Sequence, residues 1–493
     1  MQHVDVVELE PAILKIAEIC SPVNQKALKN PKLRVIIGDG RELLLTIRSK
    51  YDIIVSEPSN PYRAGVANLF TREFYESINN RLTPDGIFLQ WVQTYSVDDR
   101  TIEIFYRTLG SVFPNIESWQ TQEGDLLLAA SQAPLRYDPE TLRSRLGSEP
   151  FKGAMLAAWD TVGVEGFLAH YVGNSAMARV LQNLESWPLN TDDRTVIEFA
   201  FARSIGAPNG FQMAILRKSA QAAHCDRPEV NNAAINWDRV EEVRHTSFTQ
   251  PIENPTVDEQ HRTAALLAYS NGDLVEALHA WQAQSREPQT LQQVELLAEC
   301  LAAQGGEAAP KYIDQVADIV PSDAQAIRAR LCWKQGKVAE AVDHLKKFFE
   351  IAHDDPWPDP SLTKRSIILA ETIASSNPGA ASSLYDSLRT PLCVWNSDAD
   401  RELRLISIGA CVDGNKPGEY TARAIEAFEP NVIWERHFLE VRKAAYEVTH
   451  SRRAGQAARD FDDFMQHEAL TNDAASLTHE IEIGASPQAQ TPR

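Results

Sequence analysis

Several features that mark particular protein classes are missing from this sequence of 493 residues. Its six cysteines lie far apart and form no CxxC pair, so reduced thiols in a cytosolic protein fit better than a disulfide framework. No two histidines or cysteines have the spacing of metal ligands. The amino-terminal residues lack the basic and apolar regions of a signal peptide, and no apolar run approaches the ~20 residues that span a bilayer. We therefore expect a cytoplasmic protein with no metal site and no membrane span in this chain.

Positive charge is also scarce. The chain has 48 Lys and Arg residues against 68 Asp and Glu residues, which gives a formal net charge of −20. Because phosphate contacts need Lys and Arg, this balance argues against general binding to nucleic acid or to anionic membranes. It is compatible with cationic ligands such as polyamines, although an acidic surface usually serves solubility alone.

The first 131 residues alternate between apolar, strand-like segments and helix-like segments. Near-continuous apolar strands that alternate with helices are typical of a parallel sheet covered on both faces. The last two strands are joined by so short a turn that only an antiparallel hairpin can connect them. The predicted strands are 3–9, 33–40, 51–57, 87–95, 115–120 and 125–131, the predicted helices are 11–20, 41–48, 70–82 and 98–109, and a turn is predicted at Thr83–Gly86.

A parallel sheet closed by an antiparallel hairpin is similar to the Rossmann-type α/β fold of S-adenosylmethionine-dependent methyltransferases and their relatives. In such folds the first strand and a glycine-rich turn hold the cofactor through backbone amides. No GxGxG-type turn precedes Val4, and the chain begins at what resembles the second strand. We expect a methyltransferase-like domain without its first strand, because the start codon lies too far downstream, because the sequence is a fragment, or because the domain is degenerate.

The second half of the chain is helical and repetitive. Gly272, Gly305 and Gly336 are 33 and 31 residues apart, and each unit reads as helix, glycine turn, helix and proline stop. This pattern resembles a degenerate tetratricopeptide repeat, whose helical hairpins stack into an array with a concave face. We therefore predict an α-helical repeat domain that holds a peptide or protein partner.

The remaining segments have less regular patterns. Asn190–Asp193 precede a short apolar segment and are either a helix N-cap or a functional motif. The predicted domains are the α/β domain over 1–205, a connector with some helix over 206–255, the repeats over 256–470 and a disordered tail over 471–493.

Five segments within the first 205 residues resemble the spermidine synthase family of polyamine aminopropyltransferases, in the family's order and at its spacing. The likeness is to bacterial spermidine synthase-like proteins that occur fused to other segments. The five segments read VVELEP, GDGRELL, YDIIVSEPSNP, LFTREFYE and GIFLQWVQTY.

The resemblance implies a nucleoside site at the ends of the first two strands. Glu8 matches the family's acid that accepts hydrogen bonds from the ribose of decarboxylated S-adenosylmethionine, or of S-adenosylmethionine. Asp39 matches an acceptor for the adenine amino group, and Gly40 lets the backbone approach the ring. Glu10 matches a family Asp near the bound substrate. Two of these positions also have an interpretation that involves local structure and no ligand. The charge of Glu10 would complement a helix dipole, and Asp39–Gly40 is a common turn pair.

Glu57 is the residue to which the resemblance assigns catalysis. Aminopropyl transfer needs a neutral amine, and a carboxylate beside the nitrogen can accept its proton. The family has Asp at this position, so Glu57 keeps the chemistry with one more methylene, while a solvated loop acid is the alternative. Asn60 aligns with a second family Asp that holds the cationic amine. Its neutral side chain predicts weaker binding of a standard diamine, or a different acceptor.

Three further residues complete the predicted acceptor pocket. Tyr62 belongs to a loop that corresponds to a lid, and Gln90 and Tyr95 lie where the family lines its pocket. We therefore expect an aminopropyltransferase-like enzyme, impaired by its missing glycine-rich turn, that moves a group from an adenosyl-type donor to a small amine. The alternatives are a non-catalytic scaffold that works through its repeats and an S-adenosylmethionine-dependent methyltransferase. We also consider a homo-oligomer of this chain. We do not expect the chain to bind nucleic acid.

Overall fold

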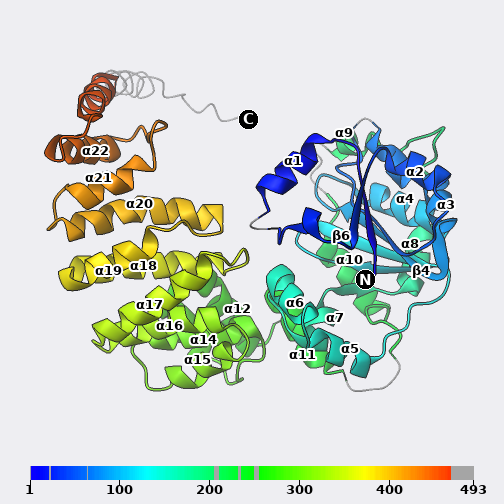
Figure 1. Ribbon diagram of the computed structural model, residues 1–493. Coiled ribbons are helices and arrows are strands. Elements are labelled where there is room, and N and C mark those ends of the chain that lie inside the picture. Colours follow the sequence, from blue (N-terminus) through cyan, green and yellow to red (C-terminus); the bar gives the residue numbers. More distant parts are fainter. Residues whose placement is uncertain are drawn as a thin grey trace, which may run out of the picture. The chain divides into compact units, whose positions relative to one another are not determined.

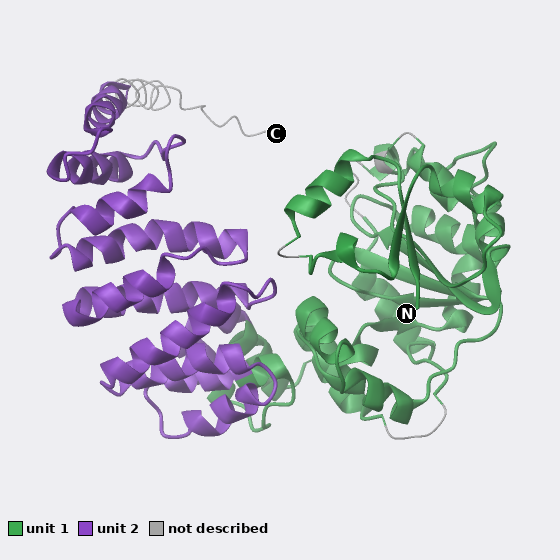
Figure 2. Cartoon of the chain, in the orientation of Figure 1, with its two compact units in different colours: residues 1–266, 280–294 green, residues 267–279, 295–493 purple. Residues whose placement is uncertain are grey.

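The computed structural model describes residues 2–21, 24–63, 65–204, 210–230, 235–248 and 255–467. The chain divides into two compact units, shown in Figure 2. Unit 1 comprises residues 1–266 and 280–294, and unit 2 comprises residues 267–279 and 295–493. Unit 1 holds all strands of the described ranges and all of the predicted site residues.

Unit 1 is built around two sheets, whose strands are drawn as arrows in Figure 1. The smaller sheet is the parallel pair β1 (Val4–Glu8) and β2 (Leu33–Ile37). The larger sheet has the order β3-β4-β6-β5-β7, in which β3 and β4 are parallel and β6 is antiparallel to both of its neighbours. This confirms the predicted parallel sheet with a terminal antiparallel hairpin. The larger sheet consists of β3 (Tyr51–Ser56), β4 (Leu82–Gln93), β5 (Asn115–Trp119), β6 (Asp125–Ser131) and β7 (Tyr171–Gly173).

The predicted turn at Thr83–Gly86 is wrong, because these residues lie within β4. Tyr51 pairs with Leu82, but the next pair joins Ile53 to Ile87. The additional residues of β4 therefore bulge out of the ladder instead of ending the strand. Strand pairing on both sides of the bulge overrides the local turn preference of the Thr-Pro-Asp-Gly sequence.

Helices account for most of the remaining chain (Figure 1). Those up to residue 248 are α1 (Ala12–Ile19), α2 (Gly40–Thr46), α3 (Arg72–Asn79), α4 (Asp99–Gly110), α5 (Pro139–Leu146), α6 (Phe151–Trp159), α7 (Gly163–Ala169), α8 (Ser175–Asn183), α9 (Ala200–Ser204), α10 (Met213–Ala222) and α11 (Trp237–Phe248), with the short 3-10 helices η1 (Ala27–Lys29) and η2 (Val66–Phe70). The later ones are α12 (Val257–Ser270), α13 (Leu274–Gln282), α14 (Leu291–Ala303), α15 (Ala309–Ala317), α16 (Pro321–Lys334), α17 (Val338–Ala352), α18 (Pro360–Ser376), α19 (Pro378–Leu388), α20 (Trp395–Val412), α21 (Glu419–Glu426) and α22 (Arg436–Val448).

The later helices confirm the predicted helical C-terminal region. Helix α16 packs on α17, α18 packs on α19 and α20, and α20 packs on α21. Gly272, Gly305 and Gly336 have φ angles of 80°, 71° and 75°, and each lies in the turn between two helices. Glycine is favoured there because side chains disfavour this left-handed backbone. That these hairpins are tetratricopeptide repeats stays a prediction, and the predicted disordered tail lies outside the described residues.

None of the helices in the described ranges is both long enough and apolar enough to cross a membrane.

Helices α10 and α11 fall within the predicted connector and belong to unit 1.

The side chains of β4 alternate between two cores. Phe88 and Val92 are fully buried on the face that also buries residues of α3 and α4. Ile87 and Leu89 face the other way and pack against a core that includes residues of α7 and α11. Both faces of the larger sheet are thus covered around β4, as expected for a central strand.

The smaller sheet is different. Strands β1 and β2 and helices α1 and α2 contain no buried residue. Leu44 of α2 packs, partly buried, against the core of the larger sheet, while the strands β1 and β2 bury none of their apolar residues.

A buried acid lies in the second core of unit 1. Glu117 on β5 is 5% exposed and accepts a hydrogen bond from the hydroxyl group of Tyr137. Burial raises the pKa of Glu117 to about 7. In the unfolded chain this carboxyl group ionises near pH 4.5. Between pH 4.5 and pH 7 the unfolded state therefore binds fewer protons than the folded state, so the free energy of unfolding falls as the pH rises through this range.

We expect Glu117→Gln to remove most of this pH dependence. A pKa difference of this size corresponds to about 3 kcal/mol, so the variant should be more stable than the wild type at pH 8 and similar to it at pH 5. Urea unfolding at both pH values measures this, with the exposed Glu123→Gln as the matched control. Equal pH dependence in the wild type and Glu117→Gln would contradict the assignment.

Candidate functional site

The carboxyl ends of β1 and β2 place Glu8 and Asp39 on neighbouring strand ends. The carbonyl oxygen of Glu8 accepts a hydrogen bond from the amide nitrogen of Gly38 at 3.0 Å. Asp39 is the N-cap of α2, and its Oδ1 accepts from the amide nitrogen of Arg41 at 2.7 Å. Asp39 therefore caps a helix, which differs from the Asp-Gly turn expected as its local alternative. Its Oδ2 accepts no hydrogen bond from the described residues. A ligand donor could still reach that second oxygen.

Glu10 has a local role as well. It is exposed, and its Oε1 accepts a hydrogen bond from the amide nitrogen of Ala12 at 2.9 Å, in the first turn of α1. Its own amide nitrogen donates to Oε1 of Glu8 at 2.8 Å. The turn after β1 thus orients the Glu8 carboxylate. A Cβ at Gly40 would meet no atom within 4 Å, so the space beside this turn is open.

Glu57 is the first residue after β3 and is exposed. No hydrogen bond or ion pair reaches its carboxylate from the residues that the structure describes. Its position at the carboxyl end of a parallel strand is where open α/β sheets bind ligands. A solvated loop acid would look the same, so catalysis by Glu57 stays a prediction.

Three predicted acceptor residues lie together. Asn60 donates through Nδ2 to the hydroxyl oxygen of Tyr62, and the hydroxyl group of Tyr95 donates to Oδ1 of Asn60 at 3.4 Å. Tyr95 lies just beyond β4 and is 48% exposed. These side chains form a polar, partly exposed group that connects the loop after β3 with the end of β4.

Gln90 has no hydrogen bond to this group in the described residues. It is fully buried on β4, and its Nε2 donates to the carbonyl oxygens of Ser56 at 3.3 Å and of Trp91 at 2.9 Å. The contact with Ser56 holds the strand end that carries Glu57. No hydrogen bond joins Glu57 to Glu8 in the described part of the chain, and the two acids belong to different sheets.

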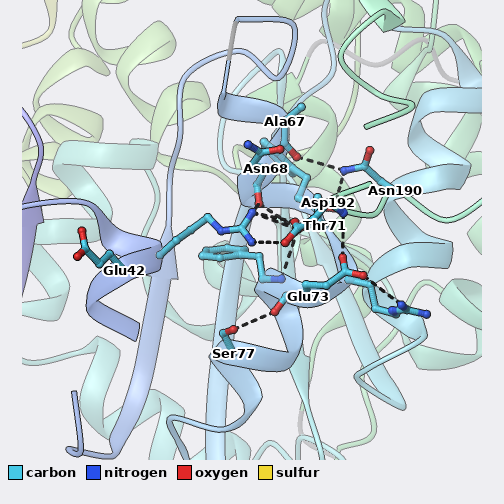
Figure 3. A network of polar contacts seen from close by, with 12 residues as sticks. Glu42, Ala67, Asn68, Thr71, Glu73, Ser77, Asn190 and Asp192 are labelled. Carbon is cyan, nitrogen blue, oxygen red and sulfur yellow. Dashed lines mark hydrogen bonds and ion pairs between the residues drawn. The ribbon is translucent and has the colours of Figure 1, made fainter. Parts of the chain in front are cut away.

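A polar network that the sequence did not predict holds the loop between β3 and α3 (Figure 3). Arg41 donates to both carboxylate oxygens of Asp192, at 3.0 and 2.6 Å, and to the carbonyl oxygen of Asn68 at 2.6 Å. Thr71 donates to Oδ1 of Asp192 at 2.7 Å. The hydrogen bond from Arg41 lowers the pKa of Asp192. Asp192 therefore connects the start of α2 to the end of this loop.

Asn190 fixes the same loop from the buried side. It is fully buried, and its Nδ2 donates to the carbonyl oxygens of Ala67 and Phe70, both at 3.1 Å. Its own carbonyl oxygen accepts from the amide nitrogen of Arg72. Asn190 thus satisfies backbone groups of η2 that would otherwise be buried without partners.

The helix N-cap interpretation of Asn190–Asp193 is wrong. The next helix, α9, begins only at Ala200, and the side chains of Asn190 and Asp192 bond to residues about 120 to 150 positions earlier in the chain. Sequence patterns detect local caps and give no access to partners so distant along the chain. The feature of the sequence that could have pointed to this network is the run of polar residues Asn190–Asp193 before an apolar segment.

We expect Asp192→Asn to loosen this loop. The bidentate ion pair is partly exposed, so its loss should lower the free energy of unfolding by only about 1 kcal/mol. Hydrogen exchange of the amides in η2 should accelerate, because the variant weakens the bonds to Arg41 and Thr71. Asp193→Asn removes the same charge from a neighbouring exposed residue and is the matched control. Identical exchange in both variants would show that Asp192 does not hold the loop.

Comparison with known proteins supports the resemblance described above. Residues 1–122 match the model of the spermine/spermidine synthase domain. The chain is 32% identical over 144 residues to a polyamine aminopropyltransferase of Synechococcus sp., covering 27% of this chain and 46% of the relative. It is 29% identical over 115 residues to polyamine aminopropyltransferase 2 of Hyperthermus butylicus, covering 23% and 38%. The chain thus spans less than half the length of these two relatives.

Two solved structures are among those to which the chain is similar. The spermidine synthase of Thermotoga maritima is 21% identical, with a TM-score of 0.26, over 29% of this chain and 50% of that one. Human methyltransferase-like protein 13 in complex with SAH is 19% identical, with a TM-score of 0.23, over 38% and 74%.

Proposed function

We propose that unit 1 is an aminopropyltransferase-like enzyme that transfers a group from an adenosyl-type donor to a small amine. The observation that carries the proposal is the match of residues 1–122 to the spermine/spermidine synthase domain. This range includes all the predicted site residues, and the acids among them lie at or just beyond the carboxyl ends of β1, β2 and β3. Nucleoside-binding α/β folds place their ligands at such strand ends.

Glu57 would act as the general base. An amine is protonated at neutral pH, and only its neutral form carries the lone pair that attacks carbon. In the proposed step the nitrogen bonds to the carbon next to the sulfonium, the carbon–sulfur bond breaks, and a neutral thioether nucleoside leaves. Glu57 takes the proton that the nitrogen loses. Because no described residue bonds to its carboxylate, the side chain is available for the incoming amine.

Asn60, Tyr62 and Tyr95 would receive the acceptor amine. Their joined amide and hydroxyl groups offer oxygen atoms to an ammonium or amine group. These groups are neutral, so they hold a cation less strongly than a carboxylate would. The chain's net charge of −20 still favours the approach of a cationic substrate.

A transfer assay tests this proposal. The full chain is incubated with decarboxylated S-adenosylmethionine and a panel of mono-, di- and triamines, and methylthioadenosine is measured by mass spectrometry. The expected result is release of methylthioadenosine that depends on the amine and on Glu57. Transfer from S-adenosylmethionine, with release of SAH, would favour the methyltransferase alternative. No product from either donor would contradict both.

A cavity in unit 2 supports a second role in binding a peptide. It has a volume of about 430 Å³ between α15, α16 and α17. Its lining includes the apolar Ile313 and Leu331, the basic Arg328 and Lys337 and the acidic Glu307 and Asp314, and Arg328 forms an ion pair with Asp314. A peptide with aliphatic residues and one acidic residue that pairs with Lys337 would match this lining. Peptides selected against the full chain from a displayed library should lose about tenfold in affinity in Lys337→Glu. Equal binding to that variant would exclude the cavity as their site.

A further inference from the structure

Two buried arginines and a buried histidine lie together in unit 1, and none of them is a predicted site residue. His170 follows α7, Arg217 is on α10 and Arg244 is on α11, and each is at most 3% exposed. Both guanidinium groups donate to the same two carbonyl oxygens, those of Ala169 and Tyr171. The two cations are therefore close neighbours in the interior of the unit. The name arginine cluster is used below for Gln120, His170, Arg217 and Arg244.

The two cations of the arginine cluster share one carboxylate. Arg244 forms an ion pair with Glu241 at 2.6 Å, whereas no carboxylate of the described residues pairs with Arg217. Arg217 donates instead to neutral oxygen atoms, which include Oε1 of Gln120 at 2.9 Å. Its Nη2 is buried and has no hydrogen-bond partner among the described residues. Because a buried charge without a counter-ion is unfavourable, this arrangement favours an anionic ligand.

His170 adds a hydrogen-bond acceptor to the cluster. Its Nδ1 lies 2.8 Å from the carbonyl oxygen of Gln120, and since a carbonyl oxygen only accepts, Nδ1 carries the proton. Burial, together with the charges of Arg217 and Arg244, lowers the pKa of His170 to about 4, so the ring is neutral at pH 7. Nε2 is then an acceptor, and it too is buried without a partner among the described residues.

The ring of Phe248 connects these two unpartnered groups. Its centroid lies 4.7 Å from Cζ of Arg217 and 5.0 Å from the centroid of the His170 ring. Trp159 stacks on the His170 ring at 3.9 Å and fixes its orientation. Phe248 is the last residue of α11 and is only partly buried, while the groups behind it are fully buried. Its side chain is therefore the one that an incoming ion would displace.

We propose that the arginine cluster binds one inorganic hydrogen phosphate ion. An oxygen atom of the ion would accept a hydrogen bond from Nη2 of Arg217, and its P–OH group would donate to Nε2 of His170. Hydrogen phosphate has both an anionic acceptor and a proton to donate at neutral pH, whereas sulfate has no proton and would place an oxygen lone pair against that of Nε2. A phosphate ester would need room for its attached group, and side chains at most 4% exposed do not provide it.

Two other sources of compensation are weaker. The carbonyl oxygens at the carboxyl end of α7 carry only the partial charge of the helix dipole. A water molecule could bridge Nη2 of Arg217 and Nε2 of His170, but it would leave the charge of Arg217 without a counter-ion. An anion satisfies both atoms and the charge at once.

Calorimetry of the full chain with inorganic phosphate tests the proposal. The titration is performed at pH 7.5 with sodium chloride as the balancing salt, beside sulfate, hydrogen carbonate and glycerol 3-phosphate. We expect saturable binding of one phosphate ion, at least about tenfold tighter than sulfate, because sulfate leaves Nε2 of His170 unsatisfied. Hydrogen carbonate, with its smaller charge, and glycerol 3-phosphate, with its attached group, should also bind more weakly. None of these titrations uses a donor or an amine, so their outcome is independent of the proposed transfer reaction.

A variant and its control assign the binding to the arginine cluster. Arg217→Met keeps the length of the side chain and removes its charge, so phosphate affinity should fall at least about tenfold. Arg239→Met removes an exposed arginine of α11 and should bind like the wild type. If Arg217→Met does not fold, hydrogen exchange of the wild type locates the site without a variant. Phosphate should slow exchange of the amides of residues 169–171 and 244–248 at least about fivefold relative to sodium chloride.

Four results would overturn the proposal. They are the absence of phosphate binding up to about 10 mM, equal binding by a folded Arg217→Met, sulfate or another of the tested anions binding as tightly as phosphate, and protection that is missing from residues 169–171 and 244–248. The first would mean that water and the carbonyl oxygens alone satisfy Arg217.

Discussion

Replacing Glu57 with glutamine is expected to lower the turnover number of amine transfer about 100- to 1000-fold. Glutamine has nearly the same shape as glutamate and cannot accept the proton of the amine. Because Glu57 is exposed and no described residue bonds to its carboxylate, the substitution should leave the fold and the nucleoside site intact. The affinity for methylthioadenosine should therefore change by less than about twofold. Steady-state kinetics and calorimetry on the same protein preparations measure both quantities.

The matched control for this prediction is Asp85→Asn. Asp85 is an exposed acid in the bulge near the amino end of β4, away from the carboxyl ends of the strands where the predicted site lies. No described residue bonds to it. This variant should retain wild-type turnover, which excludes a general effect of the lost charge. Unchanged turnover in Glu57→Gln would refute the assignment of Glu57 as the base, whatever the result for nucleoside binding.

Replacing Asn190 with alanine is expected to have the largest effect on stability. The substitution leaves the carbonyl oxygens of Ala67 and Phe70 without their donor in a fully buried position. Each unsatisfied buried group costs about 1–3 kcal/mol, so the local free energy of opening should fall by about 2–4 kcal/mol. Hydrogen exchange of the amides in η2 and α3 measures this loss separately from unit 2.

Asn183→Ala provides the comparison for Asn190→Ala. Asn183 also donates to a carbonyl oxygen, that of Arg179, but it is exposed at the end of α8, where water can replace the bond. We expect a change below about 0.5 kcal/mol for this variant. A similarly small change for Asn190→Ala would mean that η2 does not depend on the buried amide.

The sheet of unit 1 was largely predictable because its strands are short, apolar and separated by helices. The run Ile53-Ile54-Val55 before Glu57 marks a parallel strand in the sequence as it does in the structure. The Thr83–Gly86 prediction failed because turn residues indicate a local preference, and pairing with β3 on either side of them outweighs it.

The candidate site was less predictable than the strands. Sequence order places Glu8, Asp39 and Glu57 at strand ends, since the ends of parallel strands lie on one edge of a sheet. It does not reveal that Asp39 caps α2, or that Arg41 bonds to Asp192. Contacts between residues so far apart in the sequence depend on the packed fold, which no local pattern describes.

The central claim is that the carboxyl ends of β1 and β2 bind an adenosyl-type nucleoside through Glu8. Isothermal titration calorimetry of the full chain with methylthioadenosine tests it directly, with Glu8→Gln as the site variant and Glu18→Gln, at an exposed acid of α1, as the control. We predict saturable binding by the wild type and the control, and an affinity at least about tenfold lower for Glu8→Gln, because a hydrogen bond to a charged group is lost. No binding up to about millimolar nucleoside, or equal binding by Glu8→Gln, would contradict the account.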